Sequence, residues 1–304
     1  MSPPANDHLA LALGLGAALA WSTAATAFEL TLNYLDVYQL LFWSVLVTCI
    51  ALASVAALTG RWRLLRRQTR VEWLHAGLLG MLNPCAYYLL LLEAYARLPG
   101  QIALAVNYSW PIALMLLSVP LLRHRITRPD AAAALVCYGG VLVVSLPEGS
   151  DSQMQIDPTG LALALSSTLV WAGYWIARTR ESGDPVVGLL QSFLVALPCT
   201  AIVCAVFSDL MPERATGLSG AVWTGLFEMG ITFVVWLQAL RLASSAARVA
   251  LLIYVSPFLS LIFLHFIAGE AIRPATLAGL ALIVGALLCQ QLAQQRPLRD
   301  TNAP

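Results

Sequence analysis

Polar side chains recur at helical spacing inside several apolar stretches of this sequence. Asn83 and Tyr87 are four residues apart, and Glu228, Thr232 and Trp236 repeat that spacing. Residues four apart share one face of a helix. Glu228 lies about eight residues, or roughly 12 Å of helix, inside its stretch. An ionised carboxylate at that depth needs a partner, so Glu228 could bind an ammonium, carry a coupling proton, or hydrogen-bond a neighbouring helix.

Further aromatic and amide side chains lie near the middle of other apolar stretches, where the preference of Trp and Tyr for membrane interfaces does not explain them. Rings at such positions could stack on an apolar group of a substrate or hold an ammonium over a ring face. The predicted substrate-binding residues are Trp21, Asn83, Tyr87, Asn107, Tyr108, Trp110, Trp171, Tyr174, Glu228, Thr232 and Tyr254.

Two prolines, Pro111 and Pro257, fall inside apolar stretches. In mid-helix a proline removes one backbone hydrogen bond and predicts a kink. Membrane helices also tolerate proline without any functional reason. Because the two prolines occupy matching positions of an internal repeat described below, we predict that they are helix hinges or expose a carbonyl at the site.

The composition indicates what must position these residues. Hydrophobic residues make up 59% of the chain and charged residues 11%, against roughly 45–50% and about 25% in soluble domains. Unbroken apolar runs long enough to cross a ~30 Å hydrocarbon layer indicate helices rather than barrel strands. The sequence therefore predicts an all-α integral membrane protein with ten transmembrane helices, at 9–28, 37–58, 71–92, 102–122, 131–146, 161–177, 186–207, 221–240, 249–268 and 275–292.

The charges are unevenly distributed between the connecting loops. Lys and Arg total 17, all of them Arg, and all but Arg97, Arg214 and Arg273 fall in alternate loops, whereas the opposite loops are acidic. By the positive-inside rule, the N- and C-termini are expected to be cytoplasmic and the number of spans even. We therefore predict a multi-pass protein of the bacterial inner membrane with an acidic periplasmic face.

The second half of the sequence resembles the first. The segment beginning at Gly80 aligns with the segment beginning at Gly225, and the matched pairs include Asn83 with Glu228, Tyr87 with Thr232, Tyr108 with Tyr254, and Pro111 with Pro257. Five helices per half require the second half to be inverted, which places a pseudo-twofold axis and a cavity near the bilayer midplane. The predicted organisation is a first repeat at 1–148, a periplasmic linker at 149–158, and a second repeat at 159–304 with a short cytoplasmic tail.

The five-plus-five layout, Trp21, the proline-bearing fourth and ninth helices and the corner AGEAIRP at 268–274 resemble the EamA-type members of the drug/metabolite transporter superfamily. The segment 107–111, with Tyr87 and Trp171, is similar to the YddG branch, inner-membrane exporters of aromatic and other hydrophobic amino acids. This resemblance implies an alternating-access carrier whose cavity is lined by helices one, three, four, six, eight and nine.

Two departures from that resemblance bear on mechanism. The counterpart of Gly269-Glu270 in the first half reads His124-Arg125, so the corner acid occurs in the second half alone. The small multidrug branch of the superfamily uses a glutamate deep in its first helix, whereas Glu29 falls at the end of that helix. Proton-coupled drug antiport by that mechanism therefore lacks its key residue.

Other functions are open from the residues alone. The chain could transport other metabolites or drugs, or act as a channel. The GxSG form at 217–220 occurs in rhomboid intramembrane proteases, with Ser219 as nucleophile and His265 as base, although Ser219 could simply cap a helix. We predict no catalytic residue, cofactor or metal site. The expected partners are a small-molecule substrate, namely amino acids, and the lipid bilayer, with no nucleic acid. A homodimer with a second copy of the chain is an open alternative.

Overall fold

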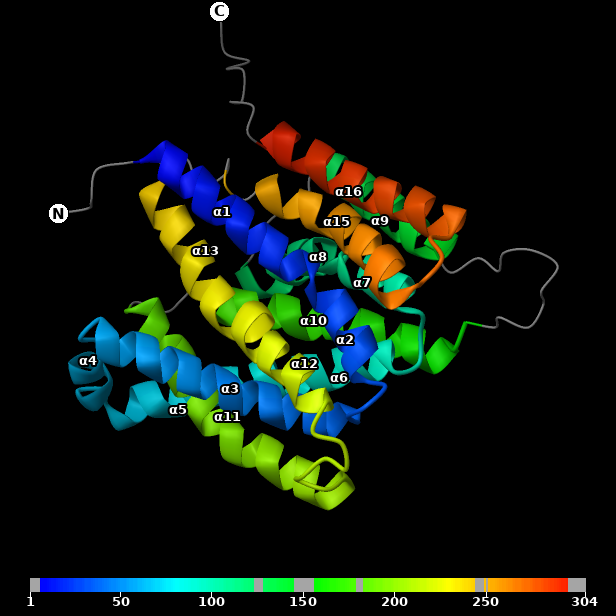
Figure 1. Cartoon of the computed structure of the whole chain (residues 1–304). Helices are drawn as coiled ribbons and strands as arrows, with labels where there is room; N and C mark the ends of the chain where they lie inside the picture. Colours follow the sequence, from blue (N-terminus) through cyan, green and yellow to red (C-terminus); the bar gives the residue numbers. More distant parts are fainter. Residues whose placement is uncertain are drawn as a thin grey trace, which may run out of the picture.

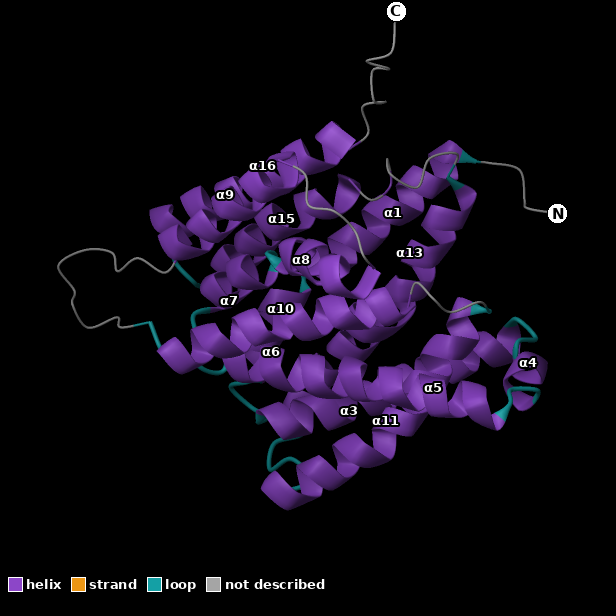
Figure 2. Cartoon of the chain, turned by 180° about the vertical axis from the view of Figure 1, so that it is seen from behind, coloured by secondary structure: helices purple, strands orange, loops and turns teal. Residues whose placement is uncertain are grey.

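The computed structural model describes residues 6–122, 128–144, 156–178, 183–243, 249 and 251–294. Within these ranges every regular element is a helix, as the composition predicts (Figure 2). Residues 149–155 of the predicted linker, and the loop residues Arg123, His124, Arg125, Arg180 and Arg248, lie outside the described residues.

The elements follow one another along the chain as shown in Figure 1. They are α1 Asp7–Ser22, α2 Ala24–Thr31, α3 Val37–Leu58, α4 Trp62–Arg66, α5 Arg70–Gly80, the π-helical η1 Met81–Ala86, α6 Tyr87–Tyr95, α7 Gly100–Asn107, α8 Trp110–Leu122, α9 Arg128–Val144, α10 Pro158–Arg178, α11 Pro185–Phe207, α12 Gly217–Trp223, the π-helical η2 Thr224–Gly230, α13 Ile231–Leu242, the 3-10 helix η3 Leu251–Val255, α15 Ser256–Phe263, the π-helical η4 Leu264–Ala268 and α16 Pro274–Gln294.

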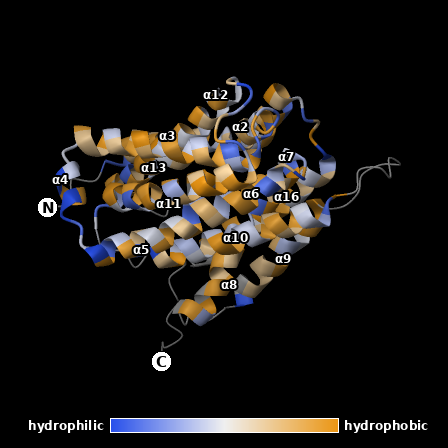
Figure 3. Cartoon of the chain, turned by 90° about the horizontal axis from the view of Figure 1, so that it is seen from below, coloured by the Kyte–Doolittle hydropathy of each residue, from blue (hydrophilic) through white to orange (hydrophobic). Residues whose placement is uncertain are grey.

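Seven helices among the described residues are long and apolar enough to cross a membrane. They cover Asp7–Thr31, Val37–Leu58, Arg70–Tyr95, Gly100–Leu121, Pro158–Arg178, Pro185–Phe207 and Gly217–Leu240, and shorter apolar helices cover Ala131–Val144, Leu252–Ala268 and Pro274–Gln290. Apolar side chains also point outward, since Leu135 and Leu142 of α9 are 77% and 69% exposed. Figure 3, in which each residue is coloured by its hydropathy, shows hydrophobic residues along the helices. A helix that is apolar on its outer as well as its inner face is typical of a membrane span.

The helices α9 and α16 pack side by side in both views of the chain (Figures 1 and 2). Their backbones approach closely at two glycines, because a Cβ atom on Gly140 would lie 2.6 Å from the carbonyl oxygen of Gly279. Small residues at such crossings are typical of membrane helices, in which close van der Waals packing replaces the hydrophobic effect as the driving force for association.

The helices α3 and α11 are connected at both of their ends. At one end the Gln39 side chain donates to the carbonyl of Asp209 at 2.9 Å, and the Trp43 indole donates to the carbonyl of Leu210 at 3.0 Å. At the other end Arg61 forms a 2.9 Å ion pair with Asp184, the residue that caps α11. The end that carries Glu29, Asp36, Glu93, Asp157 and Glu270 is called the acidic end below.

Both predicted hinge prolines lie at the start of a helix rather than in its middle. α7 ends at Asn107 and α8 begins at Trp110, so Pro111 is the second residue of α8. Pro257 is likewise the second residue of α15, after the 3-10 helix η3. Each proline therefore follows a break in its span, although at this position its missing N–H removes no intrahelical hydrogen bond. The role of the two prolines as hinges stays a prediction.

The predicted shared faces are also interrupted. Asn83 has an extended backbone (φ −141°, ψ 117°) and a cis peptide bond to Pro84, so no regular helical turn joins it to Tyr87. Between Glu228 and Thr232, the π-helix η2 ends at Gly230, whose backbone is also non-helical (φ −109°, ψ −96°). The assignment of Asn83 with Tyr87, and of Glu228 with Thr232, to one face of a continuous helix is therefore wrong, since it assumed an unbroken period of 3.6 residues. Thr232 and Trp236 both lie on α13.

Candidate functional site

Trp171, in the middle part of α10, is surrounded by aromatic rings. The Tyr87 ring stacks on it with centroids 4.4 Å apart and planes at 26°, and the Tyr174 ring lies 5.6 Å away at 24°. Three further rings meet it edge-on, those of Trp110, Trp175 and Phe233. Stacked and edge-to-face pairs at these separations are the favourable arrangements of aromatic quadrupoles. The fold thus brings together four of the predicted binding residues, Tyr87, Trp110, Trp171 and Tyr174.

Asn107, the last residue of α7, links this aromatic group to two neighbouring helices. Its amide nitrogen donates to the Tyr87 hydroxyl at 3.3 Å, and its amide oxygen accepts from the Ser167 hydroxyl of α10 at 3.5 Å. Because α7 ends here, Asn107 lies at a helix break, where its side chain is free to join α6 and α10. Tyr108, half-buried, caps the same helix.

Glu228 lies beside this group and is held by residues from two distant helices. The Tyr88 hydroxyl of α6 donates to its carboxylate at 3.1 Å, and the Trp21 indole of α1 donates to its backbone carbonyl at 3.2 Å. Trp21 also packs edge-on against Phe233 and Trp236. Tyr88 touches Tyr87 with ring centroids 4.7 Å apart, which joins the carboxylate to the aromatic stack.

The backbone of η2, which carries Glu228, is held by side chains of other helices because it is π-helical. A π-helical turn interrupts the regular ladder of backbone hydrogen bonds, so its carbonyls need other partners. Thr48 of α3 donates to the carbonyl of Gly225 at 2.9 Å, and Thr232 donates to that of Phe227 at 2.6 Å. With Trp21 on the carbonyl of Glu228, side chains from α1, α3 and α13 set the backbone that carries the acid.

We call the connected residues the Glu228 cluster, which consists of Trp21, Tyr87, Tyr88, Asn107, Ser167, Trp171, Tyr174 and Glu228. Tyr88 is absent from the predicted binding residues, as are Trp175 and Phe233, which contact Trp171. The adjacent pair Tyr87-Tyr88 was the available signal for Tyr88. The four-residue spacing from Asn83 predicts Tyr87 and leaves out Tyr88, because side chains of neighbouring residues point about 100° apart on a helix.

Asn83, Thr232 and Tyr254, also predicted to bind substrate, have surroundings separate from those of the cluster. Asn83 is buried, and its amide oxygen has no hydrogen-bond partner among the described residues. The Thr232 hydroxyl is occupied by a backbone carbonyl of its own segment. Tyr254 is half-buried against the main apolar core.

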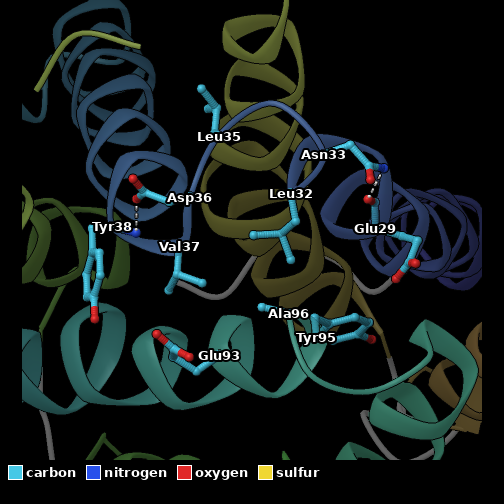
Figure 4. A pocket seen from close by; sticks show the side chains of 10 residues that line it. All are labelled: Glu29, Leu32, Asn33, Leu35, Asp36, Val37, Tyr38, Glu93, Tyr95 and Ala96. Carbon is cyan, nitrogen blue, oxygen red and sulfur yellow. Dashed lines mark hydrogen bonds between the residues drawn. The ribbon is translucent and has the colours of Figure 1, made fainter. Parts of the chain in front are cut away.

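A pocket of about 400 Å³ opens at the acidic end, away from the predicted binding residues (Figure 4). It is lined by Glu29, Leu32, Asn33, Leu35, Asp36, Val37, Tyr38, Glu93, Tyr95 and Ala96. Asp36 caps α3, and Glu93 forms an ion pair with Arg97, four residues later on the chain, at 3.2 Å. Tyr95 lies two helical turns, about 10 Å along α6, from Tyr88. The pocket and the Glu228 cluster therefore share α6 as one wall.

The corner after η4 anchors the start of α7 at this same end. Gln101 donates to the Glu270 carboxylate at 3.0 Å and to the carbonyl of Ala271 at 2.8 Å, and it accepts from the backbone N–H of Arg273 at 3.0 Å. Burial raises the pKa of Glu270, against the opposing effects of Gln101 and Arg273. A Cβ on Gly100 would lie 3.0 Å from a Glu29 carboxylate oxygen and 3.2 Å from one of Glu270. A larger residue at position 100 would therefore require these carboxylates to shift by a few tenths of an ångström.

Ser219 and His265 each hydrogen-bond a backbone carbonyl close in sequence. The Ser219 hydroxyl donates to Thr216 at 2.8 Å, and Nδ1 of His265 lies 3.0 Å from the carbonyl oxygen of Glu270. α12 begins at Gly217, so Ser219 lies in its first turn and does not cap it, contrary to the structural alternative considered for this residue. Neither side chain is positioned by a hydrogen bond to the other.

Comparison with known proteins identifies the family of this chain. Residues 8–146 and 158–289 each match the EamA-like transporter family. The aromatic amino acid exporter YddG of Ancylobacter novellus is 27% identical over 93% of this chain and 97% of its own length, and protein PecM of Dickeya dadantii is 27% identical over 73% and 75%. The inner membrane protein YtfF of Escherichia coli is 26% identical over 82% and 85%. A solved crystal structure has the same fold, with a TM-score of 0.66 and 23% identity over 95% of this chain and 98% of that one. The chain belongs to the EamA-like transporter family, within the drug/metabolite transporter superfamily, and is a membrane transporter.

Proposed function

We propose that this protein is an alternating-access exporter of aromatic and other hydrophobic amino acids in the bacterial inner membrane. The observation that carries the proposal is the group of aromatic rings around Trp171, in which Tyr87 and Tyr174 both stack with it. Such rings match a planar or bulky apolar side chain. The name of the relative YddG, an exporter of aromatic amino acids, supports the same substrate class.

In this proposal the ten predicted helices form two inverted repeats, 1–148 and 159–304, with both termini in the cytoplasm. The two separate family matches support the repeat, and the arginine-rich loops support the orientation. Pro111 and Pro257 act as hinges, because each begins a helix directly after a break in its span. Movement at these breaks would carry Asn107, Tyr108 and Tyr254, which flank them.

The substrate side chain contacts Tyr87, Trp110, Trp171 and Tyr174. Glu228 supplies a negative charge to the site, and Asn107 supplies a neutral amide that can donate and accept hydrogen bonds. The remaining predicted residues, Trp21, Asn83, Tyr108, Thr232 and Tyr254, complete the path that the substrate follows through the helices. A second copy of the chain is expected to pack through the plain lipid-facing surfaces of α9 or α16.

The test is counterflow of labelled phenylalanine and leucine into liposomes that contain the purified protein. Trp171→Ala is expected to reduce the initial rate at least about fivefold, since it removes a ring contact worth roughly 1 kcal/mol or more. Tyr108→Ala is expected to reduce the rate as well, because Tyr108 lies at the break between α7 and α8 on the proposed substrate path. Trp62→Ala is the matched control, because Trp62 lies on the short helix α4, is 37% exposed, and has no ring contact with the cluster.

Absence of saturable counterflow for amino acids in the wild type would refute the proposed substrate class. Single-channel current in a planar bilayer would instead show a channel. Covalent labelling of Ser219 by a fluorophosphonate would show a serine hydrolase, and retention of full transport by Trp171→Ala would remove the aromatic group from the site.

A further inference from the structure

Glu228 is the one member of the Glu228 cluster that carries a formal charge. The other polar groups of the cluster are hydroxyls, indole N–H groups and the Asn107 amide, all of which are neutral. The exposure of Glu228 as a whole residue is intermediate, so its carboxylate is at least partly withdrawn from bulk solvent. A partly desolvated single carboxylate attracts a ligand of the opposite charge far more strongly than it would in water.

The position of the carboxylate is held independently of any ligand. Tyr88 donates to one oxygen of Glu228, and Trp21 holds the backbone carbonyl of the same residue. An ionised carboxylate accepts about four hydrogen bonds, so a single tyrosine hydroxyl leaves it able to accept from an ammonium group. Because both contacts come from other helices, the acid does not have to be ordered when a substrate arrives.

Aromatic rings border the same carboxylate. The Tyr88 hydroxyl bonds to it directly, the Tyr87 ring lies 4.7 Å from that of Tyr88 between centroids, and the Trp21 indole bonds to the backbone carbonyl of the same residue. A carboxylate next to aromatic side chains can recognise an ammonium group by ion pairing, with cation–π attraction added where the ammonium meets a ring face. Carboxylate anions are repelled by both elements of this arrangement.

We infer that the Glu228 cluster recognises the ammonium group of its ligand, and that primary amines with an aromatic side group bind more tightly than amino acids with the same side group. This rests on the proposed function, since it concerns the same site. An amine neutralises Glu228, whereas a zwitterion also brings a carboxylate. Within the cluster that carboxylate meets neutral donors, of which the Asn107 amide and Ser167 already bond one another.

Three compounds with one phenyl ring separate these charges: phenethylamine, phenylalanine and 3-phenylpropionate. Each competes against labelled phenylalanine in counterflow at fixed pH without a pH gradient. We expect half-inhibition by phenethylamine at a concentration about tenfold below that of phenylalanine, and no inhibition by 3-phenylpropionate, from the usual strength of a charge-assisted hydrogen bond.

Glu228→Gln keeps the shape of the side chain and removes its charge. It is expected to raise the half-inhibiting concentration of phenethylamine about tenfold or more and to abolish its advantage over phenylalanine. Tyr88→Phe keeps the ring and should produce a smaller loss of the same kind. Glu213→Gln is the matched control, because Glu213 is an exposed acid in the loop before α12.

Inhibition by 3-phenylpropionate equal to that by phenethylamine would overturn the inference, as would an unchanged amine-to-phenylalanine ratio in Glu228→Gln. A Glu228→Gln protein that keeps this ratio but loses its response to a pH gradient would assign Glu228 to proton transfer instead. If Glu228→Gln does not fold, the wild-type series and Tyr88→Phe decide the matter. Absence of phenylalanine counterflow in the wild type would refute the proposed function, whereas normal counterflow without amine preference would refute this inference alone.

Discussion

The ion pair between Arg61 and Asp184 gives a test of how α3 and α11 are held together. Partial burial works to raise the pKa of Asp184, but the Arg61 guanidinium and the backbone N–H groups of Val186 and Val187 together hold that pKa below its usual range. The ionised form is therefore favoured by the folded protein. Asp184→Asn removes the charge and keeps an oxygen that can still cap α11.

The expected loss of unfolding free energy follows from two contributions of Asp184, its ion pair with Arg61 and its cap on α11. The pair has side-chain exposures of 28% and 21%, so loss of the ion pair in Asp184→Asn should lower the free energy of unfolding by about 0.5–1 kcal/mol. Asp184→Ala also removes the cap and should cost about 1 kcal/mol more. The assay is unfolding of the detergent-solubilised protein by heat or denaturant, followed by circular dichroism.

The pH dependence of this effect has a definite sign. A carboxyl whose pKa is lowered by folding stabilises the protein above its unfolded pKa, which is about 3.9 for Asp. That stability is lost as the pH falls through the lower, folded value. The difference between wild type and Asp184→Asn should therefore be full at pH 6 and shrink below about pH 4. If wild type and Asp184→Asn differ by the same free energy of unfolding at pH 6 and below about pH 4, the role assigned to the charge of Asp184 is refuted.

Two further substitutions test the helix contact and the corner described above. Gly140→Leu should lower the unfolding temperature of the protein in detergent and separate α9 from α16, because a Cβ there meets the Gly279 carbonyl at 2.6 Å; an unchanged unfolding temperature would contradict the close packing. Relative to wild type, Glu270→Gln should become more stable as the pH rises above about 4.3. The reason is that the folded protein raises the pKa of Glu270, so ionisation of this acid lowers the free energy of unfolding of the wild type. Equal unfolding temperatures for this variant and wild type across pH 4–8 would show that burial of Glu270 carries no cost.

Much of the architecture follows from local patterns in the sequence. Apolar runs of about 20 residues identify helices that can cross a membrane, because each run meets the requirement of the hydrocarbon layer by itself. The Glu93–Arg97 pair was predictable for the same reason, since residues four apart meet within a single helix. The candidate residues Trp171, Tyr87 and Glu228 were identified from polar or aromatic character at depth, which also needs no knowledge of their neighbours.

The interruptions of the helices were not predictable from the same patterns. Periodicity assumes a constant 3.6 residues per turn, whereas η1 and η2 widen to π-helix and the span containing Pro111 divides into α7 and α8. Whether a proline lies inside a helix or at its start depends on where the preceding segment ends. That boundary is decided by packing against other helices. The proline alone therefore indicated that the helix is interrupted, but not whether the interruption is a kink or the start of a new helix.

The partners of Glu228 show most clearly what tertiary structure decided. Sequence placed an acid at membrane depth and required a partner for it, because an isolated charge is unfavourable there. The partners are Tyr88, 140 residues away, and Trp21, 207 residues away. Hydrogen bonds between residues so distant in sequence leave no periodic signal, and they form because α1, α6 and η2 pack together. The chemistry of the site was therefore determined by residue type, and its geometry by the fold.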